Sequence, residues 1–173
     1  MKIIDKLSES VRGELKFDII DNRTNEIVDS FDDHNVVVFD SGKILIKRLY
    51  EDLSDYRVRV VKLGTDTGSG TDDSPETESR ENVASDMDVL YTITEMSVDY
   101  SGDFETSYNI FINGQDVMEE YPEEDSVGFT SLGLFSQNDI LFSFRRFPVR
   151  TITENFSVNI IWKIYYDFEN FEE

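Results

Sequence analysis

The alternation of apolar and polar residues is the strongest structural signal in this chain, and it is clearest in the C-terminal third. Residues 133–144 form two apolar runs around a polar turn, the pattern of a β-hairpin, and residues 155–168 form a longer alternating run. Because neighbouring side chains of a strand point to opposite faces, this alternation predicts strands with one buried face. Trp162, the single tryptophan, shares a face with Ile160 and Ile164, so we expect it in the core.

Shorter segments of the same kind predict the other strands. They are residues 13–21, 26–31, 36–39, 57–63, 89–100, 104–112, 127–135 and 140–147. The segments 89–100 and 104–112 read as one long antiparallel pair. Asn22-Arg23-Thr24-Asn25 is a turn cluster, and Asn113-Gly114 is a tight-turn signal.

One segment follows the helical period instead. Leu45, Leu49 and Leu53 are spaced by four residues, and Asp40 or Ser41 can cap the start of a helix. We therefore predict a mainly β fold, an antiparallel sandwich or barrel-like domain, with one helix near residues 41–54.

The length of 173 residues predicts a single β-rich domain over residues 1–173. A long polar loop is expected at residues 64–82, rich in Gly, Ser, Thr, Asp and Glu, and an acidic tail at residues 167–173. A loop of this length is either mobile or ordered by a neighbouring subunit.

The charge narrows the classes of partner. With 37 acidic and 16 basic residues, the formal net charge is -21. This argues against binding nucleic acid through its phosphates and against an anionic membrane surface. It suits high solubility, a cationic partner or divalent cations. The N-terminal apolar run is too short for a secretory signal, so we expect synthesis in a cytoplasm.

The residue types disfavour an enzyme. The chain has no cysteine, which excludes thiolate metal sites and cysteine nucleophiles. His34 is the single histidine, and nothing near it resembles a nucleophile elbow. The glycine-rich stretch 64–70 lacks the ending of a phosphate-binding loop. We expect no catalytic residues and no cofactor.

Two groups of charged residues are candidates for binding. Oxygen-rich loops can hold calcium, and the candidate ligands are Asp66, Asp72 and Asp73. The one basic spot is the candidate for an interface with an adjacent copy, where it would meet an acidic patch. Its residues are Arg145, Arg146 and Arg150. A solvated hairpin edge is an equal interpretation of these arginines.

Aromatic residues near the C-terminus raise carbohydrate binding as an alternative. The cluster comprises Trp162, Tyr165, Tyr166 and Phe168. A carbohydrate module needs aromatic side chains exposed in a groove, and Tyr121 is a further candidate. Burial of Trp162 in the core would weaken this interpretation.

Three short phrases carry a resemblance to a known class of protein. The first is the segment 35–45, a short apolar strand followed by Gly42 and an apolar helix pattern. The second is a strand ending in Leu63-Gly64-Thr65 that opens into a polar loop reaching Pro75. The third is the Gly133-Leu134-Phe135 hairpin, a Phe147-Pro148 step and the Trp162 strand. In these phrases the chain resembles small β-rich virion structural proteins of tailed bacteriophages. Residues 116–125 and the tail depart from the pattern.

The resemblance implies assembly and not catalysis. It implies a non-enzymatic structural subunit of the tail, neck or baseplate that assembles as repeated copies. The implied partners are other virion proteins and copies of the same chain, and the implied location is the virion, after synthesis in the host cytoplasm. A capsid decoration protein and a host-surface carbohydrate-binding module of a fibre are the alternatives.

Overall fold

The computed structural model describes residues 11–38, 57–66, 86–102 and 105–166. Within these ranges it contains one short helix, α4 (Gly114–Glu119), and nine strands. The strands are β1 (Val11–Asp21), β2 (Glu26–Val38), β3 (Val58–Asp66), β4 (Met87–Ile93), β5 (Ser97–Gly102), β6 (Glu105–Ile112), β7 (Val127–Ser136), β8 (Leu141–Ile152) and β9 (Phe156–Tyr166). The predicted helix at 41–54 and the predicted tail at 167–173 lie outside the described residues.

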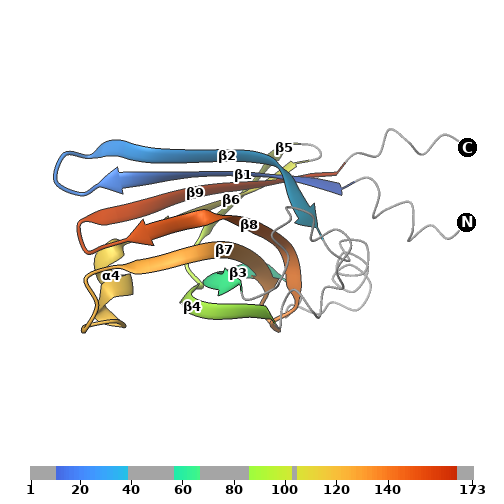
Figure 1. The fold of residues 1–173 in the computed structure, drawn as a ribbon. Coiled ribbons are helices and arrows are strands. Elements are labelled where there is room, and N and C mark those ends of the chain that lie inside the picture. Colours follow the sequence, from blue (N-terminus) through green and yellow to red (C-terminus); the bar gives the residue numbers. More distant parts are fainter. Residues whose placement is uncertain (1–10, 39–56, 67–85, 103–104, 167–173) are drawn as a thin grey trace, which may run out of the picture.

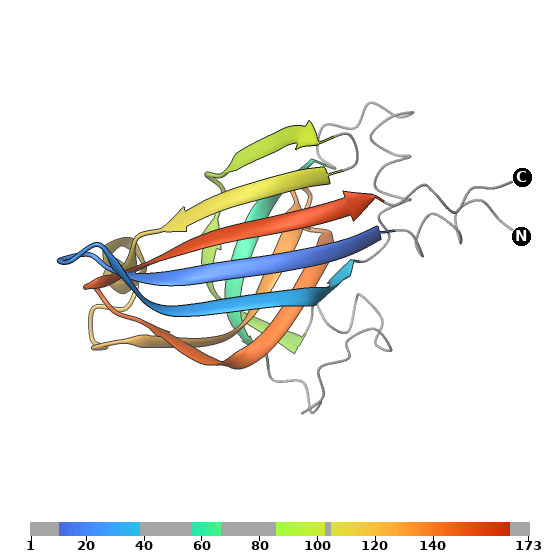
Figure 2. The same cartoon turned by 90° about the horizontal axis from the view of Figure 1, so that it is seen from above.

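The strands form two antiparallel sheets, which confirms the predicted β sandwich. Sheet A has the order β2-β1-β9-β6-β5, and sheet B has the order β4-β3-β7-β8. Strand β2 joins the two sheets, because Val37 and Val38 near its end pair with Phe144 and Ser143 of β8. The sheets stack as two layers (Figure 1), and their strands cross at an angle when seen from above (Figure 2). Helix α4 lies at the end of the molecule opposite to the start of β1 and the end of β9 (Figure 1).

The core lies between the two layers and is rich in aromatic side chains. Trp162, Ile160 and Ile164 of β9 are all 0% exposed, as the alternation of this strand predicted. Four rings from both sheets pack together, with centroids 5.2–6.4 Å apart. They belong to Phe17, Phe31, Phe129 and Phe147. Burying rings of this size stabilises the sandwich through apolar area and ring contacts.

The predicted C-terminal hairpin is confirmed as β7 and β8. Phe135 pairs with Leu141, and Asp139 in the turn has φ 66°. The turn predicted at residues 22–25 is also present, with Asn25 at φ 58°. Asn and Asp tolerate this left-handed conformation better than most residues, which explains their position in these turns.

The segment 89–100 is two strands and not one. Strand β4 lies at the edge of sheet B, β5 lies at the edge of sheet A, and residues 94–96 carry the chain from one sheet to the other. Ile93 is buried and Met96 packs against the same core. Two core residues three positions apart do not fit one straight strand, whose period is two, so the chain bends between them.

Asn113-Gly114 is not a hairpin turn. Asn113 caps α4, and its side-chain oxygen accepts a hydrogen bond from the Gln115 amide at 3.1 Å. A Cβ atom on Gly114 would lie 1.9 Å from the Phe156 carbonyl oxygen and 2.1 Å from that of Thr153. The helix therefore packs so closely on the β8–β9 turn that only glycine fits at its first position.

A second apolar cluster lies on the outer face of sheet B, away from the main core. Its buried members are Met87, Phe135, Leu141 and Phe144, with Val60 packed against them. We call this set the outer cluster.

Strand β3 continues to Asp66, so the predicted loop begins later than residue 64.

Candidate functional site

The three arginines of the basic spot form ion pairs inside the chain. Arg145 pairs with Asp33 of β2, and Arg150 pairs with Asp29 of the same strand. Arg146 pairs with Asp66 at the end of β3, and both side chains are at least nine-tenths buried. The charges of the basic spot are therefore neutralised by carboxylates of the same chain. The role of these arginines in an interface stays a prediction.

Arg145 and Arg150 link the two sheets across the seam between β2 and β8. The main chains of β2 and β8 pair at Val37 and Val38. The ion pairs of Arg145 and Arg150 extend the contact between the two strands beyond these residues. The Arg150 guanidinium also lies 5.7 Å from the centre of the Phe17 ring. A guanidinium over an aromatic face is attracted by the negative potential of the ring. The seam is thus held by charge and aromatic contacts from both sheets.

The calcium candidates are only partly visible in the structure. The Asp66 carboxylate is bound to Arg146, while Asp72 and Asp73 lie outside the described residues. Among the residues that the structure describes, no group of three or more acidic or histidine side chains is placed to hold a metal ion. His34 lies within β2, and its side chain is outside the described part.

The proposed carbohydrate platform at the C-terminus does not form around Trp162, since that side chain lies in the core. Tyr165 is half-buried, its hydroxyl donates to the Glu14 carboxylate at 2.9 Å, and Arg12 lies 4.8 Å from its ring centre. Burial and the Glu14 hydrogen bond raise the pKa of Tyr165 above its ordinary value. The side chain of Tyr166 and the whole of Phe168 lie outside the described part.

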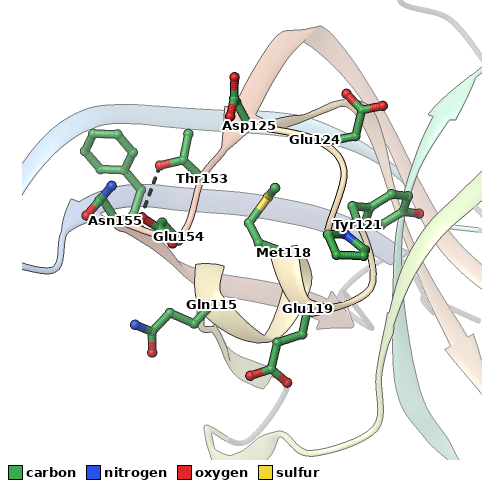
Figure 3. A pocket seen from close by; sticks show the side chains of 11 residues that line it. Gln115, Met118, Glu119, Tyr121, Glu124, Asp125, Thr153, Glu154 and Asn155 are labelled. Carbon is green, nitrogen blue, oxygen red and sulfur yellow. Dashed lines mark hydrogen bonds between the residues drawn. The ribbon is translucent and has the colours of Figure 1, made fainter.

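A large cleft lies beside α4, and we call it the α4 cleft (Figure 3). Its volume is about 930 Å³, and it opens between α4, the loop after it and the β8–β9 turn. The lining residues are Gln115, Met118, Glu119, Tyr121, Pro122, Glu124, Asp125, Thr153, Glu154, Asn155 and Phe156. The turn is closed by a hydrogen bond from the Phe156 amide to the Thr153 carbonyl oxygen at 3.1 Å.

The α4 cleft is strongly negative. Glu119, Glu124, Asp125 and Glu154 are exposed around it, and its lining contains no Lys, Arg or His. Tyr121 is half-buried at its rim and donates a hydrogen bond to the Leu90 carbonyl oxygen at 2.7 Å. Burial, together with the charges of Glu120 and Asp88, raises the pKa of Tyr121. This potential favours neutral or cationic ligands over anionic ones.

One feature of the sequence corresponds to the α4 cleft, namely an acidic segment, but this segment matches no pattern of a known site. Residues 116–125 contain six acidic residues and no basic ones, which marks an acidic segment but not its shape. The cleft is formed because helix α4 and the loop after it lie against the distant residues 153–156. These two segments are distant in the sequence, so their contact could not be predicted from it. The acidic segment alone does not specify a ligand.

The described residues contain no helix with the length and apolar character needed to cross a bilayer. A comparison of the chain with models of protein families, with curated proteins and with solved structures finds no match.

Proposed function

We propose that this chain is a non-enzymatic structural subunit of a tailed-bacteriophage virion, a tail, neck or baseplate component that assembles as repeated copies. One observation supports the proposal above all. The phrases that carry the resemblance are far apart in the sequence, and their described parts lie mostly on adjacent strands of one sheet.

The strands that contain most of these phrases pair directly with one another. Lys62 and Leu63, in the strand of the Leu-Gly-Thr phrase, pair with Gly133 and Leu132 of β7. Strand β7 pairs with β8, which contains the Phe147-Pro148 step. The end of β2, from the first phrase, pairs with the other side of β8. The Trp162 strand is the exception, since β9 belongs to sheet A.

The glycines of two phrases also make room for the same apolar cluster. A Cβ atom on Gly64 would lie 2.9 Å from the Met87 side chain and 2.5 Å from the Asp88 carbonyl oxygen. A Cβ atom on Gly133 would lie 2.4 Å from the Phe135 ring. Both glycines thus leave space for members of the outer cluster. The phrases therefore describe a packing unit of the sheet, which is a structural requirement of the fold.

The charge distribution suits a subunit that stays soluble before it assembles. The basic spot is paired within the chain, while the end that carries α4 is acidic. A net charge of -21 keeps free copies apart in solution. A more basic neighbour would meet this end with complementary charge, which fixes orientation at an interface.

Cross-linking of the purified virion, followed by mass spectrometry and electron cryo-microscopy, tests the proposal. We expect cross-links to tail, neck or baseplate proteins and density for this sandwich in a symmetric arrangement. Cross-links to the major capsid protein alone would make the chain a decoration protein and contradict the tail assignment. Absence of the chain from the particle, with a monomer that binds none of the virion proteins, would overturn the proposal.

A further inference from the structure

Phe111 is a large aromatic side chain left in water on the outer side of sheet A. It is 61% exposed, whereas its neighbours on β6, Ile110 and Ile112, are buried in the core. A single exposed apolar residue is common in soluble proteins and is not evidence of a site by itself. Here the ring stands at the border of a cleft, and the cleft is the second observation.

The cleft has a volume of about 300 Å³ and lies where three parts of the chain meet. These are the end of β4 with the crossover to β5, the end of β6, and the beginning of α4. The lining residues are Tyr91, Thr92, Ile93, Thr94, Glu95, Phe111, Ile112, Asn113 and Asp116. We call it the Phe111 cleft. Its volume is at the lower end of the range of about 300–1,000 Å³ that is typical of small-ligand sites.

Several polar side chains line the Phe111 cleft. Asn113 is held by its cap, and its amide nitrogen donates to the Asp116 carboxylate at 3.4 Å. Thr92 at the end of β4 and Thr94 in the crossover also line the cleft, and both carry hydroxyl groups. Hydroxyl groups both donate and accept, and a carboxylate accepts, so this set can bind a ligand that presents several hydroxyl groups.

The electrostatics select against anionic ligands. Glu95 and Asp116 line the cleft. Burial, together with the charges of Asp116, Glu120 and Glu119, raises the pKa of Tyr91 in its wall. A phosphate or an acidic sugar would be repelled by this potential. A neutral sugar has hydroxyl groups for the carboxylates and a face of C–H groups, slightly positive, for the negative face of an aromatic ring.

We propose that the Phe111 cleft binds a neutral carbohydrate. Phe111 stacks on one sugar ring, and Asp116 and Glu95 accept hydrogen bonds from its hydroxyl groups. This site goes beyond the structural role proposed above and does not depend on it, since both a virion subunit and an unrelated protein can carry it. It also differs from the α4 cleft, whose lining residues are different.

The test uses the full chain on an array of neutral, anionic and cationic glycans, followed by calorimetric titration of the best neutral ligand. We expect binding to neutral glycans. Phe111→Ala and Phe111→Leu should each weaken it by about tenfold or more, because both remove the stacking ring. Phe111→Trp should keep it, and Asp116→Asn should weaken it. Thermal unfolding of each variant checks that the fold is intact.

Two control variants separate this site from other surfaces. Tyr100→Ala removes a ring that is 56% exposed on β5, and Gln115→Ala changes the α4 cleft. Neither should alter the affinity. The proposal is overturned if no neutral glycan binds at millimolar concentration, or if anionic or cationic ligands bind better. It is also overturned if Phe111→Ala binds as tightly as the unchanged chain.

Discussion

The outer faces of the two sheets differ in chemistry. On sheet A, polar side chains pair along the surface: Lys163 lies 2.9 Å from the Glu105 carboxylate, and Lys16 lies 3.4 Å from that of Asp18. The outer face of sheet B carries the outer cluster instead, and in this cluster Phe144 is 0% exposed. Sheet A is thus buried on one face, whereas sheet B is buried on both faces around Phe135 and Phe144.

This difference is visible in how burial runs along the strands. In β9, buried and half-buried residues alternate from Val158 to Ile164, as expected for a strand with one wet face. In β8, all seven residues from Leu141 to Phe147 are buried. A continuous buried run belongs to a strand that is covered on both faces. The apolar C-terminal hairpin is therefore covered on both faces at residues 141–147 of β8.

The largest expected effect comes from removing a ring on the buried outer face. Phe144→Ala should lower the free energy of unfolding by about 3–5 kcal/mol, because it leaves a cavity in a packed cluster. Phe111→Ala makes the same change on the outer side of sheet A and should stay within about 0.5 kcal/mol. Denaturant unfolding measures both variants. Equal losses would contradict the difference between the two faces.

Breaking the ion pair between Asp66 of β3 and Arg146 of β8 should also lower the free energy of unfolding. Asp66→Asn leaves the guanidinium of Arg146 without its carboxylate, and both side chains are at least nine-tenths buried. We expect a loss of about 3 kcal/mol, the lower end of the range for breaking a buried pair. Replacing both residues, as in Asp66→Asn with Arg146→Met, should recover part of this loss in the same unfolding experiment. No recovery would show that the pair itself is not the cause.

Two glycines of β7 provide a matched test of packing. Gly133→Ala places a methyl group 2.4 Å from the Phe135 ring and should cost about 1–3 kcal/mol through overpacking. Gly128→Ala meets nothing closer than the Val149 side chain at 3.5 Å. That variant should be neutral or slightly stabilising, by up to about 1 kcal/mol. The melting temperatures of the two variants should therefore move apart.

The salt bridge on the outer face of sheet A should contribute little. The pKa of Glu105 is lowered, mainly by its hydrogen bond with Lys163, and the pKa of Lys163 is raised by the same contact. Both side chains are about one-third exposed, so solvent screens the pair. Glu105→Gln should cost about 0.2–1 kcal/mol, and less at high salt. A loss as large as that of Asp66→Asn would contradict the difference between the two faces.

The smallest effect concerns the turn between β1 and β2. Hydrogen bonds from Arg23 lower the pKa of Asp21 from 3.8 to about 2. A carboxyl group with a lowered pKa in the folded state stabilises the fold above pH 3.8, and this contribution is lost as the pH falls toward 2. Asp21→Asn should remove this part of the acid dependence and leave the rest unchanged. Unfolding curves measured across this pH range check the difference.

The strands could be predicted because their signal is local. The alternation in β1 and β9, the hairpin at residues 133–144 and the core position of Trp162 all follow from side chains that point to opposite faces of a strand. The resemblance added a hypothesis about function, which stays a proposal. The crossover at residues 94–96 was missed, although the spacing of Ile93 and Met96 contained a signal for it.

The candidate sites could not be predicted, because each of them joins segments that are distant in the sequence. The α4 cleft needs residues 115–125 beside residues 153–156, and the Phe111 cleft needs β4 and the crossover beside the end of β6. The sequence marks residues 116–125 as acidic, but an acidic composition does not specify a shape.

The amino-acid sequence by itself determined a β fold, most of its strands and the burial of Trp162, since these depend on the local period of side chains. The tertiary structure decided which side chains meet. It paired Arg145, Arg146 and Arg150 with carboxylates far away in the chain, and it buried one outer face while leaving the other in water. The physical reason is that strand pairing and sheet stacking bring together residues whose separation in sequence carries no record of their contact.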